Sequence, residues 1–390
     1  TVTREQIQSG PFSLWRYAAL LPVPANIAES RNLAPGMTRL HRADNLAKAL
    51  GITGTLWVKD DSGNPTHSFK DRVVAVAQSA GIQLGFDTLA CASTGNLAHA
   101  VAAAAARELA HSAPEGLKSR EVVIGYDRRF LAPELAEAIC AAVRGCELVP
   151  LLCETAVPTP ACSWAVVERQ ALGALVITAS HNPPEWLGLK IKGPFGGSVE
   201  GDFTKRVETR LAAGGITVPM TGATERFDAM GTYLAGLQAK LDTQALSSGL
   251  ESMGLHVVVD PMHGSAAGGM AGLLPGALAS GHLREIRSNR DPLFGGHPPE
   301  PLAAYLQQLI GEVQASTAAG KPAVGIVFDG DGDRIAAVDE RGRFCSTQLL
   351  MPLFIDHLAR AKGMDGAVIK TVSGSDLMQL VAEGLGRQVI

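Results

Sequence analysis

The chain is poor in aromatic side chains and in charge, and it has no long apolar run. Aromatic residues make up 5% and charged residues 18% of its 390 residues, and the formal net charge is −4. Such a small, slightly acidic charge balance does not suit a nucleic-acid or membrane surface. No stretch of about 18 consecutive apolar residues is present, so no membrane span is expected. We therefore expect a cytoplasmic protein without nucleic-acid or membrane partners.

The chain also lacks a Cys-x-x-Cys pair, and no secretory leader is expected. Its six cysteines are scattered, which in a chain of this length favours buried free thiols over disulfides or structural zinc. The first residues lack the charged and apolar regions of a signal peptide. The sequence begins at Thr1 rather than at methionine and ends at Ile390 within an expected strand, which indicates a fragment.

What the chain has in quantity is apolar sequence arranged in short runs. Hydrophobic residues make up 46% of the chain, enough to bury the cores of two or three domains. Most runs lack polar alternation, as strands buried on both faces of a parallel sheet do, and helical segments separate them. We therefore expect an α/β fold throughout. The expected strands are Leu56–Lys59, Thr88–Ala92, Glu121–Gly125, Leu148–Leu152, Ala174–Thr178, His256–Asp260, Ala323–Phe328 and Ala367–Lys370, and the expected helices include Pro133–Val143, Phe203–Ala212 and Leu349–Ala361.

A serine loop directly follows the expected strand Ala174–Thr178. Such a strand ends at the carboxyl edge of its sheet, where open α/β folds bind their ligands. Ser180 follows at once, and Pro183 and Pro184 keep the loop from continuing straight into a helix. The Ser180 hydroxyl is therefore a candidate carrier of a phosphoryl group.

Three carboxylates directly follow another expected strand, Ala323–Phe328. Asp329, Asp331 and Asp333 alternate with Gly330 and Gly332. The three charges repel one another in a semi-buried site unless a cation is bound, and the glycines let the backbone turn all three toward one point. Oxygen ligands favour Mg²⁺ or Ca²⁺ over zinc. A phosphate-bearing hydroxyl and a carboxylate cluster are together the two halves of a phosphoryl-transfer centre.

The carboxylate loop has two other interpretations. The three aspartates and Glu340 fall at the acidic positions of a calcium-binding EF-hand loop. However, Arg334 stands where that loop needs glycine, and the flanking segments are strand-like rather than helical. The remaining alternative is a solvated acidic turn without a metal.

The serine loop, with three further strings, resembles the phosphohexomutases, the family of phosphoglucomutase and phosphomannomutase. The string Thr-Ala-Ser-His-Asn-Pro at 178–183 is similar to the phosphoserine loop of that family. The strings at 123–129, 259–264 and 291–294 are similar to its Gly-x-Asp-x-Arg strand, its second-domain opening strand and its interdomain loop. The resemblance covers about residues 118–390 in the order of the family, without its first strand, its sugar loop or its fourth domain.

This resemblance implies a series of three-layer α/β/α domains and a set of site residues. It implies domain I at 118–235 without its first strand, domain II with the metal loop at 250–361, and the start of domain III at 364–390. It also implies Mg²⁺ held by Asp329, Asp331, Asp333 and the phosphoserine oxygen of Ser180. Lys190 and Arg334 are the further catalytic candidates, although Leu187 replaces an asparagine that the family has before this lysine. The candidate substrate-binding residues are Arg129, His181 and Lys370.

The first hundred residues belong to a different pattern. Lys70 opens an expected helix, where the positive end of the helix dipole disfavours the charged amine and suits Schiff-base chemistry. The strings at 64–72 and 89–96 resemble the amino-terminal part of threonine synthase, a pyridoxal-phosphate enzyme of fold type II. That resemblance implies cofactor binding by Lys70, Ser93 and Asn96. It ends near Ala106, before the glycine-rich loop that holds the cofactor phosphate.

The predicted function is therefore that of a phosphohexomutase. Phosphorylated Ser180 and Mg²⁺ move a phosphoryl group between hydroxyls of a hexose phosphate, with low turnover expected because sugar-binding parts of the family are missing. One alternative is threonine synthase activity, which makes L-threonine from O-phosphohomoserine with pyridoxal phosphate. The other is an inactive remnant that joins two incomplete enzymes.

Overall fold

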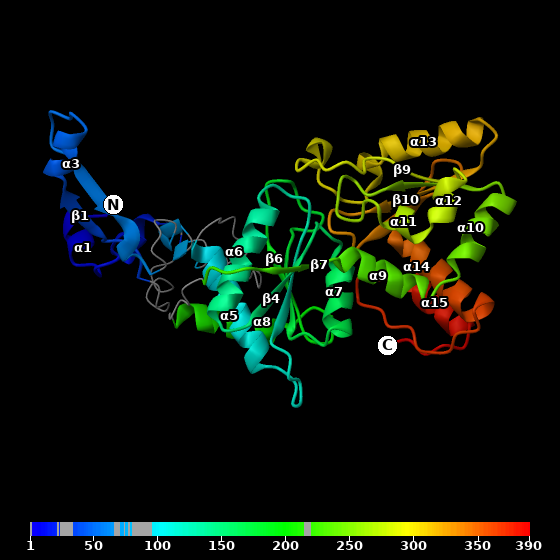
Figure 1. Ribbon diagram of the computed structural model, residues 1–390, viewed down its shortest axis with the longest axis horizontal. Coiled ribbons are helices and arrows are strands. Elements are labelled where there is room, and N and C mark those ends of the chain that lie inside the picture. The colour runs from blue at the N-terminus through cyan, green and yellow to red at the C-terminus, as the bar shows by residue number, and fades with distance from the viewer. Residues whose placement is uncertain are drawn as a thin grey trace.

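The computed structural model describes residues 2–21, 23, 34–65, 71–73, 75, 76, 79, 96–213 and 220–390. An N-terminal segment, a first α/β domain and a second α/β domain follow one another along the longest axis (Figure 1). Within the described residues, no helix is both long enough and apolar enough to cross a bilayer. The expected strand Thr88–Ala92 lies outside them.

The N-terminal segment is a small, thinly packed unit. Its strands β1 and β2 pair antiparallel with Arg39 opposite Asp60, and all four residues of β1 are exposed. Among its described residues, the buried core consists of Trp15, Val23 and Ala75. Strand β2 lies where a strand was expected at Leu56–Lys59. The elements are α1 (Arg4–Gln8), η1 (Leu14–Leu20), β1 (Arg39–Arg42), α3 (Asp44–Ala49), β2 (Trp57–Asp60) and η2 (Asp61–Gly63).

The first α/β domain is built on a five-stranded mixed sheet of order β6-β5-β3-β4-β7. The pairs β3–β4, β3–β5 and β4–β7 are parallel, and β6 pairs antiparallel with β5 at the edge. The three parallel strands expected here are present, and they are mostly buried on both faces, as their continuous apolar sequences predicted. The strands are β3 (Glu121–Tyr126), β4 (Val149–Cys153), β5 (Gly173–Ile177), β6 (Leu189–Lys192) and β7 (Glu225–Phe227).

Helices cover both faces of this sheet. Helices α5, α6 and α8 bury Val122 and Ile124 of β3 on one face, and α7 buries Val123 and the thiols of Cys153 and Cys162 on the other. The described cysteines form no disulfide, and Cys140, Cys153 and Cys162 are buried. The helices are α5 (Asn96–His111), α6 (Ala132–Gly145), α7 (Thr159–Glu168) and α8 (Gly201–Ala212).

Helix α5 is fixed to the first domain by ion pairs around a buried glutamate. The Glu108 side chain is fully buried and accepts hydrogen bonds from Arg206 Nε at 2.6 Å, Arg210 Nε at 2.5 Å and the Ser112 hydroxyl at 2.8 Å. Burial alone raises the pKa of Glu108, but these three partners outweigh it and lower the pKa to about 2. Helix α5 is therefore an integral part of the first domain.

The second α/β domain has a sheet of order β12-β11-β10-β8-β9. Strand β8 is parallel to β10 and β9, and β11 and β12 continue antiparallel from β10. Val258 of β8 packs with α13, while Val257 and Val259 face α11 and α12 on the other side, as alternation along a strand requires. The elements are α9 (Ala229–Gln238), α10 (Thr243–Ser252), β8 (His256–Asp260), α11 (Gly269–Leu273), α12 (Pro275–Ala279), β9 (Leu283–Glu285), η3 (Phe294–Gly296), η4 (Ala303–Tyr305), α13 (Gln307–Ala318), β10 (Ala323–Phe328), β11 (Ile335–Val338) and β12 (Phe344–Cys345).

The last part of the chain is helical, with little strand structure. The helix expected at Leu349–Ala361 is present as α14 (Thr347–Asp356) followed by the π-helical turn η5 (His357–Ala361), and α15 (Asp376–Gly384) packs against α14. The strand expected at Ala367–Lys370 is wrong. Among the described residues, this segment pairs with a neighbour only through an isolated bridge from Val368 to Val389, and no regular strand lies beside it. The α/β class itself is confirmed.

Candidate active site between the two α/β domains

The serine loop and the aspartate loop meet where the two α/β domains touch. Ser180 lies just beyond the carboxyl end of β5, and Asp329 directly follows β10. The Ser180 hydroxyl donates a hydrogen bond of 2.8 Å to Asp329 Oδ2. Two loops that are far apart in the sequence thus form one site, in which Ser180 is 8% exposed and Asp329 is fully buried.

Ser180 has a left-handed backbone conformation with φ of 52°. Such a conformation costs a residue with a side chain about 1–2 kcal/mol, so the surroundings must stabilise it. Its N–H donates to the Thr178 hydroxyl at 2.8 Å, and its carbonyl accepts from Arg129 Nη2 at 2.8 Å. Both backbone polar groups of the serine are therefore fixed.

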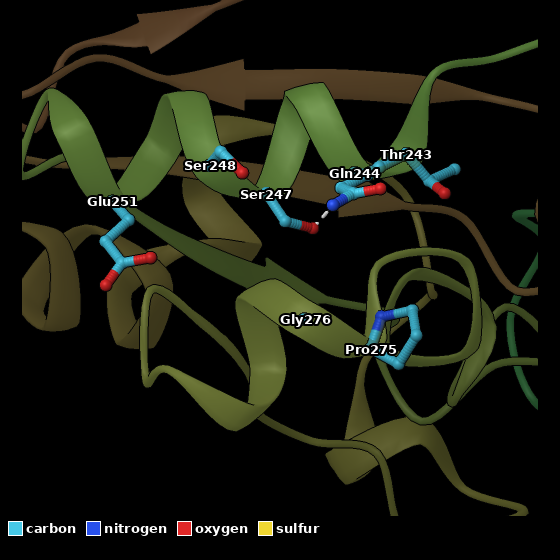
Figure 2. Close-up of a pocket in the computed structure, with 7 residues that line it drawn as sticks. All are labelled: Thr243, Gln244, Ser247, Ser248, Glu251, Pro275 and Gly276. Carbon is cyan, nitrogen blue, oxygen red and sulfur yellow. Dashed lines mark hydrogen bonds between the residues drawn. The ribbon is translucent and has the colours of Figure 1, made fainter.

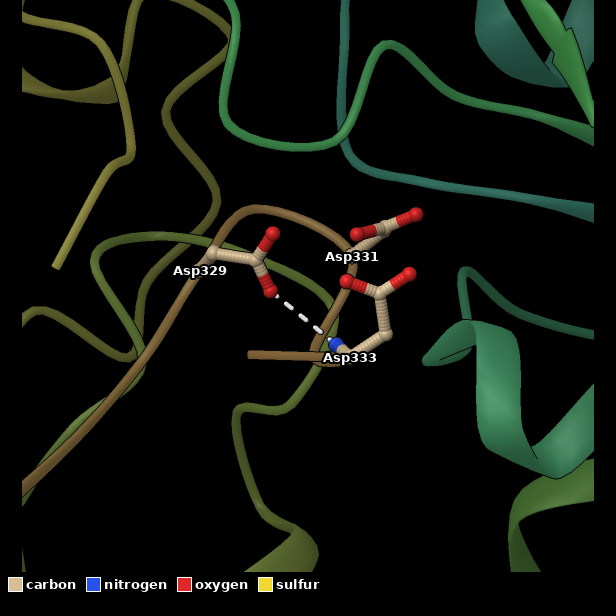
Figure 3. Close-up of side chains that lie close together, drawn as sticks. All are labelled: Asp329, Asp331 and Asp333. Atoms are coloured by element: carbon tan, nitrogen blue, oxygen red, sulfur yellow. Dashed lines mark hydrogen bonds between the residues drawn. The ribbon is translucent and has the colours of Figure 1, made fainter. Parts of the chain in front are cut away.

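The aspartate loop brings its three carboxylates to one point (Figure 3). One oxygen atom from each of Asp329, Asp331 and Asp333 lies within 4.8 Å of the others. Asp329 Oδ1 accepts from the backbone N–H of Asp333 and of Arg334, both at 3.0 Å, which closes the loop on itself. Burial, then the charges of Asp331 and Asp333, raises the pKa of Asp329 to about 7.

The two loops approach so closely that only glycine fits between them. A Cβ atom on Gly330 would lie 2.6 Å from the Ser180 carbonyl oxygen and 2.8 Å from Pro299 Cγ. A Cβ atom on Gly264 would lie 2.6 Å from the Gly330 oxygen. The contact with the serine loop therefore requires Gly330, whereas Gly332 has a left-handed backbone with φ of 69° that favours glycine.

Lys190, on the edge strand β6, lies among the carboxylates. Its Nζ donates to Asp331 Oδ2 and to Asp333 Oδ2, both at 2.6 Å. Burial lowers the pKa of Lys190, but the charge of Asp331 and the hydrogen bonds to both aspartates outweigh it, so the net pKa is raised. For Asp331, burial is likewise outweighed by Lys190 and by the Thr159 hydroxyl at 2.7 Å, so its pKa is lowered. The ammonium group of Lys190 therefore neutralises part of the acidic cluster.

Arg334 and His181 both lie near the same acidic residue, Glu300. Arg334 Nη1 and His181 Nε2 each lie 4.0 Å from Glu300 Oε1. Burial, then the positive charge of Arg334, lowers the pKa of His181. The histidine is therefore held in its neutral form near the Arg334 guanidinium.

The remaining candidates from the sequence lie in different surroundings. Arg129 is 1% exposed, and its guanidinium donates only to protein groups in the described contacts, which does not favour direct substrate binding. Lys370 Nζ donates to the Gly374 carbonyl and to Asp376, within its own segment. Lys70 and Ser93 lie outside the described residues, as does the side chain of Asn96.

Sequence reasoning missed several residues that support the site. Thr159 at the start of α7 donates from its hydroxyl to Asp331 Oδ2, and its backbone N–H donates to the Asp331 carbonyl at 2.8 Å. No local pattern reveals this contact, because the partners are 172 positions apart. Phe294 and Glu300 were likewise missed as site residues, although Phe294 ends the string at 291–294 and Glu300 follows it in the same Gly/Pro-rich loop.

The donor set of the aspartate loop suits a hard divalent cation. Asp331 Oδ1 is buried and has no hydrogen-bond partner, while the other Asp331 oxygen is fully engaged. An unpaired buried carboxylate oxygen is costly unless a cation or water pairs with it. Oxygen-only ligands of this kind fit Mg²⁺.

A hollow lies between α10 and α12, and its lining includes no residue of the serine or aspartate loop (Figure 2). Among its lining residues only Glu251 is ionisable, and none is basic. The lining includes Thr243 and Pro275, the first residues of α10 and α12, but no arginine or lysine that would pair with a phosphate group. Its lining residues are Thr243, Gln244, Ser247, Ser248, Glu251, Pro275 and Gly276.

Family models match most of the chain. Residues 84–215 match the phosphoglucomutase/phosphomannomutase alpha/beta/alpha domain I, and residues 232–342 match domain II of the same family. The first match includes Ser180 and the second includes the aspartate loop. Residues 32–109 match the model of pyridoxal-phosphate dependent enzymes, so the two kinds of match overlap at 84–109.

Individual relatives agree with the family matches. A phosphoglucomutase/phosphomannomutase of Thermococcus kodakarensis is 29% identical over 71% of this chain and 59% of its own length. A phosphoglucosamine mutase of Mycolicibacterium paratuberculosis is 31% identical over 73% of this chain and 61% of its own. A crystal structure assigned to a phosphomannomutase of Thermus thermophilus matches with a TM-score of 0.65 and 32% identity, over 75% of this chain and 63% of that one.

The chain thus spans less than two thirds of the length of these relatives. The matches include both loops of the candidate site and the strands β5 and β10 that precede them. Over residues 84–215 and 232–342, the chain belongs to the phosphoglucomutase/phosphomannomutase family.

Proposed function

We propose that the site transfers a phosphoryl group between phosphorylated Ser180 and a hydroxyl of a hexose or hexosamine phosphate. The observation that carries the proposal is the contact of 2.8 Å between the Ser180 hydroxyl and the carboxylate of Asp329, from two different domains. The names of the relatives supply the substrate class, since they include phosphoglucosamine mutase as well as phosphoglucomutase/phosphomannomutase.

In the proposed step, the sugar hydroxyl oxygen forms a bond to phosphorus as the bond between phosphorus and the Ser180 oxygen breaks. The sugar hydroxyl loses its proton in this step, and the Ser180 oxygen gains one. Asp329, Asp331 and Asp333 would hold Mg²⁺ beside the serine. When bound, this ion offsets negative charge on the transferring oxygens.

Basic residues of the site have separate roles in the proposed transfer. Lys190 is held in its charged form by Asp331 and Asp333, so it is able to donate a hydrogen bond or a proton to an oxygen that gains charge. Arg334 presents a fixed positive charge beside Glu300, and neutral His181 presents a ring nitrogen to the same space. We propose Lys370 as a substrate contact only at the far side of the sugar, since it contacts none of these residues here.

The proposal is tested by the chemical state of Ser180. Incubation of the chain with Mg²⁺ and a hexose 1,6-bisphosphate should add one phosphoryl group to the peptide that contains Ser180, as measured by mass spectrometry. The Ser180→Ala chain should gain none. Equal labelling of both chains would count against the assignment of the nucleophile.

Full mutase turnover by this chain should be low. The matched residues carry domains I and II, whereas the relatives are longer than the part that matches. Interconversion of hexose 1-phosphate and 6-phosphate by the purified chain should therefore be near background in a coupled assay. Turnover comparable to that of a full-length relative would contradict this expectation.

A second candidate function belongs to the N-terminal segment. Its match to pyridoxal-phosphate dependent enzymes over residues 32–109 supports a cofactor bound through Lys70, with Ser93 and Asn96 beside it. Addition of pyridoxal phosphate should then give a yellow protein whose absorbance is lost in Lys70→Ala. A colourless protein would remove threonine synthase as a candidate and leave only the mutase-type site.

A further inference from the structure

The Arg129 guanidinium is the centre of a buried hydrogen-bond cluster beneath the serine loop. Arg129 is 1% exposed and lies just after β3, in the loop that leads to α6. Its Nε donates to Asp127 Oδ2 at 3.0 Å. Its two terminal nitrogens donate to four carbonyl oxygens of the serine loop, those of Ser180 and Asn182 at 2.8 Å, Pro183 at 2.6 Å and Trp186 at 3.1 Å.

The same cluster also fixes the other side of Ser180. The Ser180 N–H donates to the Thr178 hydroxyl, which in turn donates to Asp127 Oδ2 at 2.8 Å. Asp127 therefore connects the hydroxyl that accepts from the serine N–H to the guanidinium that donates to the serine carbonyl. Arg129 binds the Ser180 carbonyl directly, and Asp127 orients the Thr178 hydroxyl that accepts from the Ser180 N–H. These hydrogen bonds stabilise the left-handed conformation of Ser180.

The second domain closes over this cluster. The ring of Phe294 stacks on the Arg129 guanidinium, with 5.0 Å between the ring centroid and Cζ, and Phe294 is 2% exposed. Arg290 donates to the Arg129 carbonyl at 3.1 Å, and Arg128 donates to the Ser288 carbonyl at 2.6 Å. The Arg129 guanidinium thus contacts both the serine loop and the second domain.

We propose that Arg129 is a positioning residue for phosphoryl transfer. Phe294 of the second domain holds the Arg129 guanidinium in place by packing on it. The pair sets where the Ser180 oxygen lies relative to Asp329, although neither side chain touches the reacting atoms. This inference rests on the proposed function, since it concerns the same serine. A misplacement of about 1 Å is enough to slow a reaction by roughly 100-fold.

Lysine cannot replace this arginine in the proposed role. A guanidinium presents five N–H groups in a rigid plane, whereas an ammonium group has three donors at a single point. Arg129→Lys keeps the charge opposite Asp127 but cannot reach four carbonyls that lie around the guanidinium plane. The substitution therefore changes the geometry of the serine loop while it keeps a positive charge beside the buried Asp127 carboxylate.

The test uses the full chain with phosphoserine incorporated at position 180 and Mn²⁺ bound in place of Mg²⁺. Bound Mn²⁺ accelerates the relaxation of the phosphorus NMR signal, and the effect falls steeply with the distance between metal and phosphorus. In Arg129→Lys and in Phe294→Leu, the relaxation enhancement should fall several-fold while the affinity for Mn²⁺ is unchanged. A merely structural role would lower the melting temperature without moving phosphorus away from the metal in the folded protein.

Arg169→Lys is the matched control, because Arg169 also pairs with a carboxylate, Glu121, and stacks on an aromatic ring, Phe227, in the same domain. It should leave the relaxation unchanged. Unchanged relaxation in both test variants would overturn the positioning role alone, and if Arg129→Lys fails to fold, Phe294→Leu decides. Absence of Mn²⁺ binding or of any enhancement in the unsubstituted chain would overturn the proposed function itself, and this inference with it.

Discussion

At the scale of single residues, the site depends on carboxylates that the protein neutralises only in part. Lys190 and Thr159 both engage the same oxygen of Asp331, and the other oxygen remains buried without a partner. Burial, then the charges of Asp331 and Asp333, raises the pKa of Asp329 to about 7. The three carboxylates therefore carry more negative charge than Lys190 neutralises, which favours the binding of a further cation.

Removal of the Asp331 carboxylate, which has one unpaired oxygen, should abolish most of the metal affinity. Asp331→Asn deletes one negative charge and the buried oxygen that lacks a partner, so the affinity for Mg²⁺ should fall by more than about 10-fold. Calorimetric titration with Mg²⁺ measures this directly. Asp339→Asn is the control, since Asp339 lies in the same domain but accepts from Arg343 outside the cluster. Equal affinity in the two variants would contradict the assignment of the metal ligands.

The two loops that carry the chemistry could be predicted from the sequence, whereas the residues that contact them across the domain boundary could not. The order Asp-Gly-Asp-Gly-Asp at 329–333 and the string around Ser180 are local patterns, so both loops could be located from the amino-acid order alone. Thr159 and Phe294 act across the domain boundary, and contacts at such sequence separation leave no local pattern. Arg129 was found for the same reason as the serine, and its burial favours the positioning role proposed above over direct contact with a substrate.

At the scale of loops and helices, the close contact between the serine and aspartate loops has a measurable requirement. Gly330→Ala places a methyl group 2.6 Å from the Ser180 oxygen, so the loops must separate. The melting temperature should fall, and Ser180 phosphorylation should slow by about 100-fold for a displacement near 1 Å. Gly311→Ala in α13 is the control, because nothing lies within 4 Å of its added carbon and alanine favours a helix. An unaffected phosphorylation rate in Gly330→Ala would show that the loops are not tightly coupled.

Helix α5 should make the chain sensitive to acid through Glu108. The pKa of Glu108 is lowered to about 2 in the folded protein, so its stabilising effect is complete above the ordinary pKa and is lost as pH falls toward 2. Glu108→Gln should cost about 1–3 kcal/mol of unfolding free energy at neutral pH, with a smaller cost in acid, as measured by urea unfolding. Glu137→Gln, which removes an exposed pair with Arg226, should cost less than about 1 kcal/mol at either pH.

The regular elements were predicted well where apolar runs are buried on both faces. Strands β8 and β10 have the expected bounds, and β3, β4 and β5 agree to within a residue or so. The edge strands β6, β7, β9 and β12 were not expected, because short, partly exposed strands carry little apolar pattern. The expected strand Ala367–Lys370 is apolar enough, but it has no neighbouring strand in the described chain.

At the scale of the whole molecule, the described residues of the N-terminal segment and those of the two α/β domains form separate cores. The small core around Trp15 shares no residue with the clusters of the two α/β domains. Helix α5, in contrast, contributes Ala102, Ala105 and Leu109 to the core of the first domain. We infer that the first domain begins with α5 rather than after it.

This division predicts different outcomes for two shortened chains. A chain that starts at residue 96 should fold and bind Mg²⁺ as the full chain does, because α5 is retained. A chain that starts at residue 112 should expose the apolar face of the first domain and aggregate. Circular dichroism and size-exclusion chromatography distinguish these outcomes, and a monodisperse, folded product from residue 112 would contradict the role given to α5.

Helix α5 also carries a consequence for the two family resemblances, which overlap at residues 84–109. Its alanine face is already filled by α6 and α8, and its one buried acid is already bound to two arginines of α8. Residues 96–109, which both family models match, pack within the first α/β domain in this structure. The apolar face of this helix is therefore not free to form the core of a second fold at the same time.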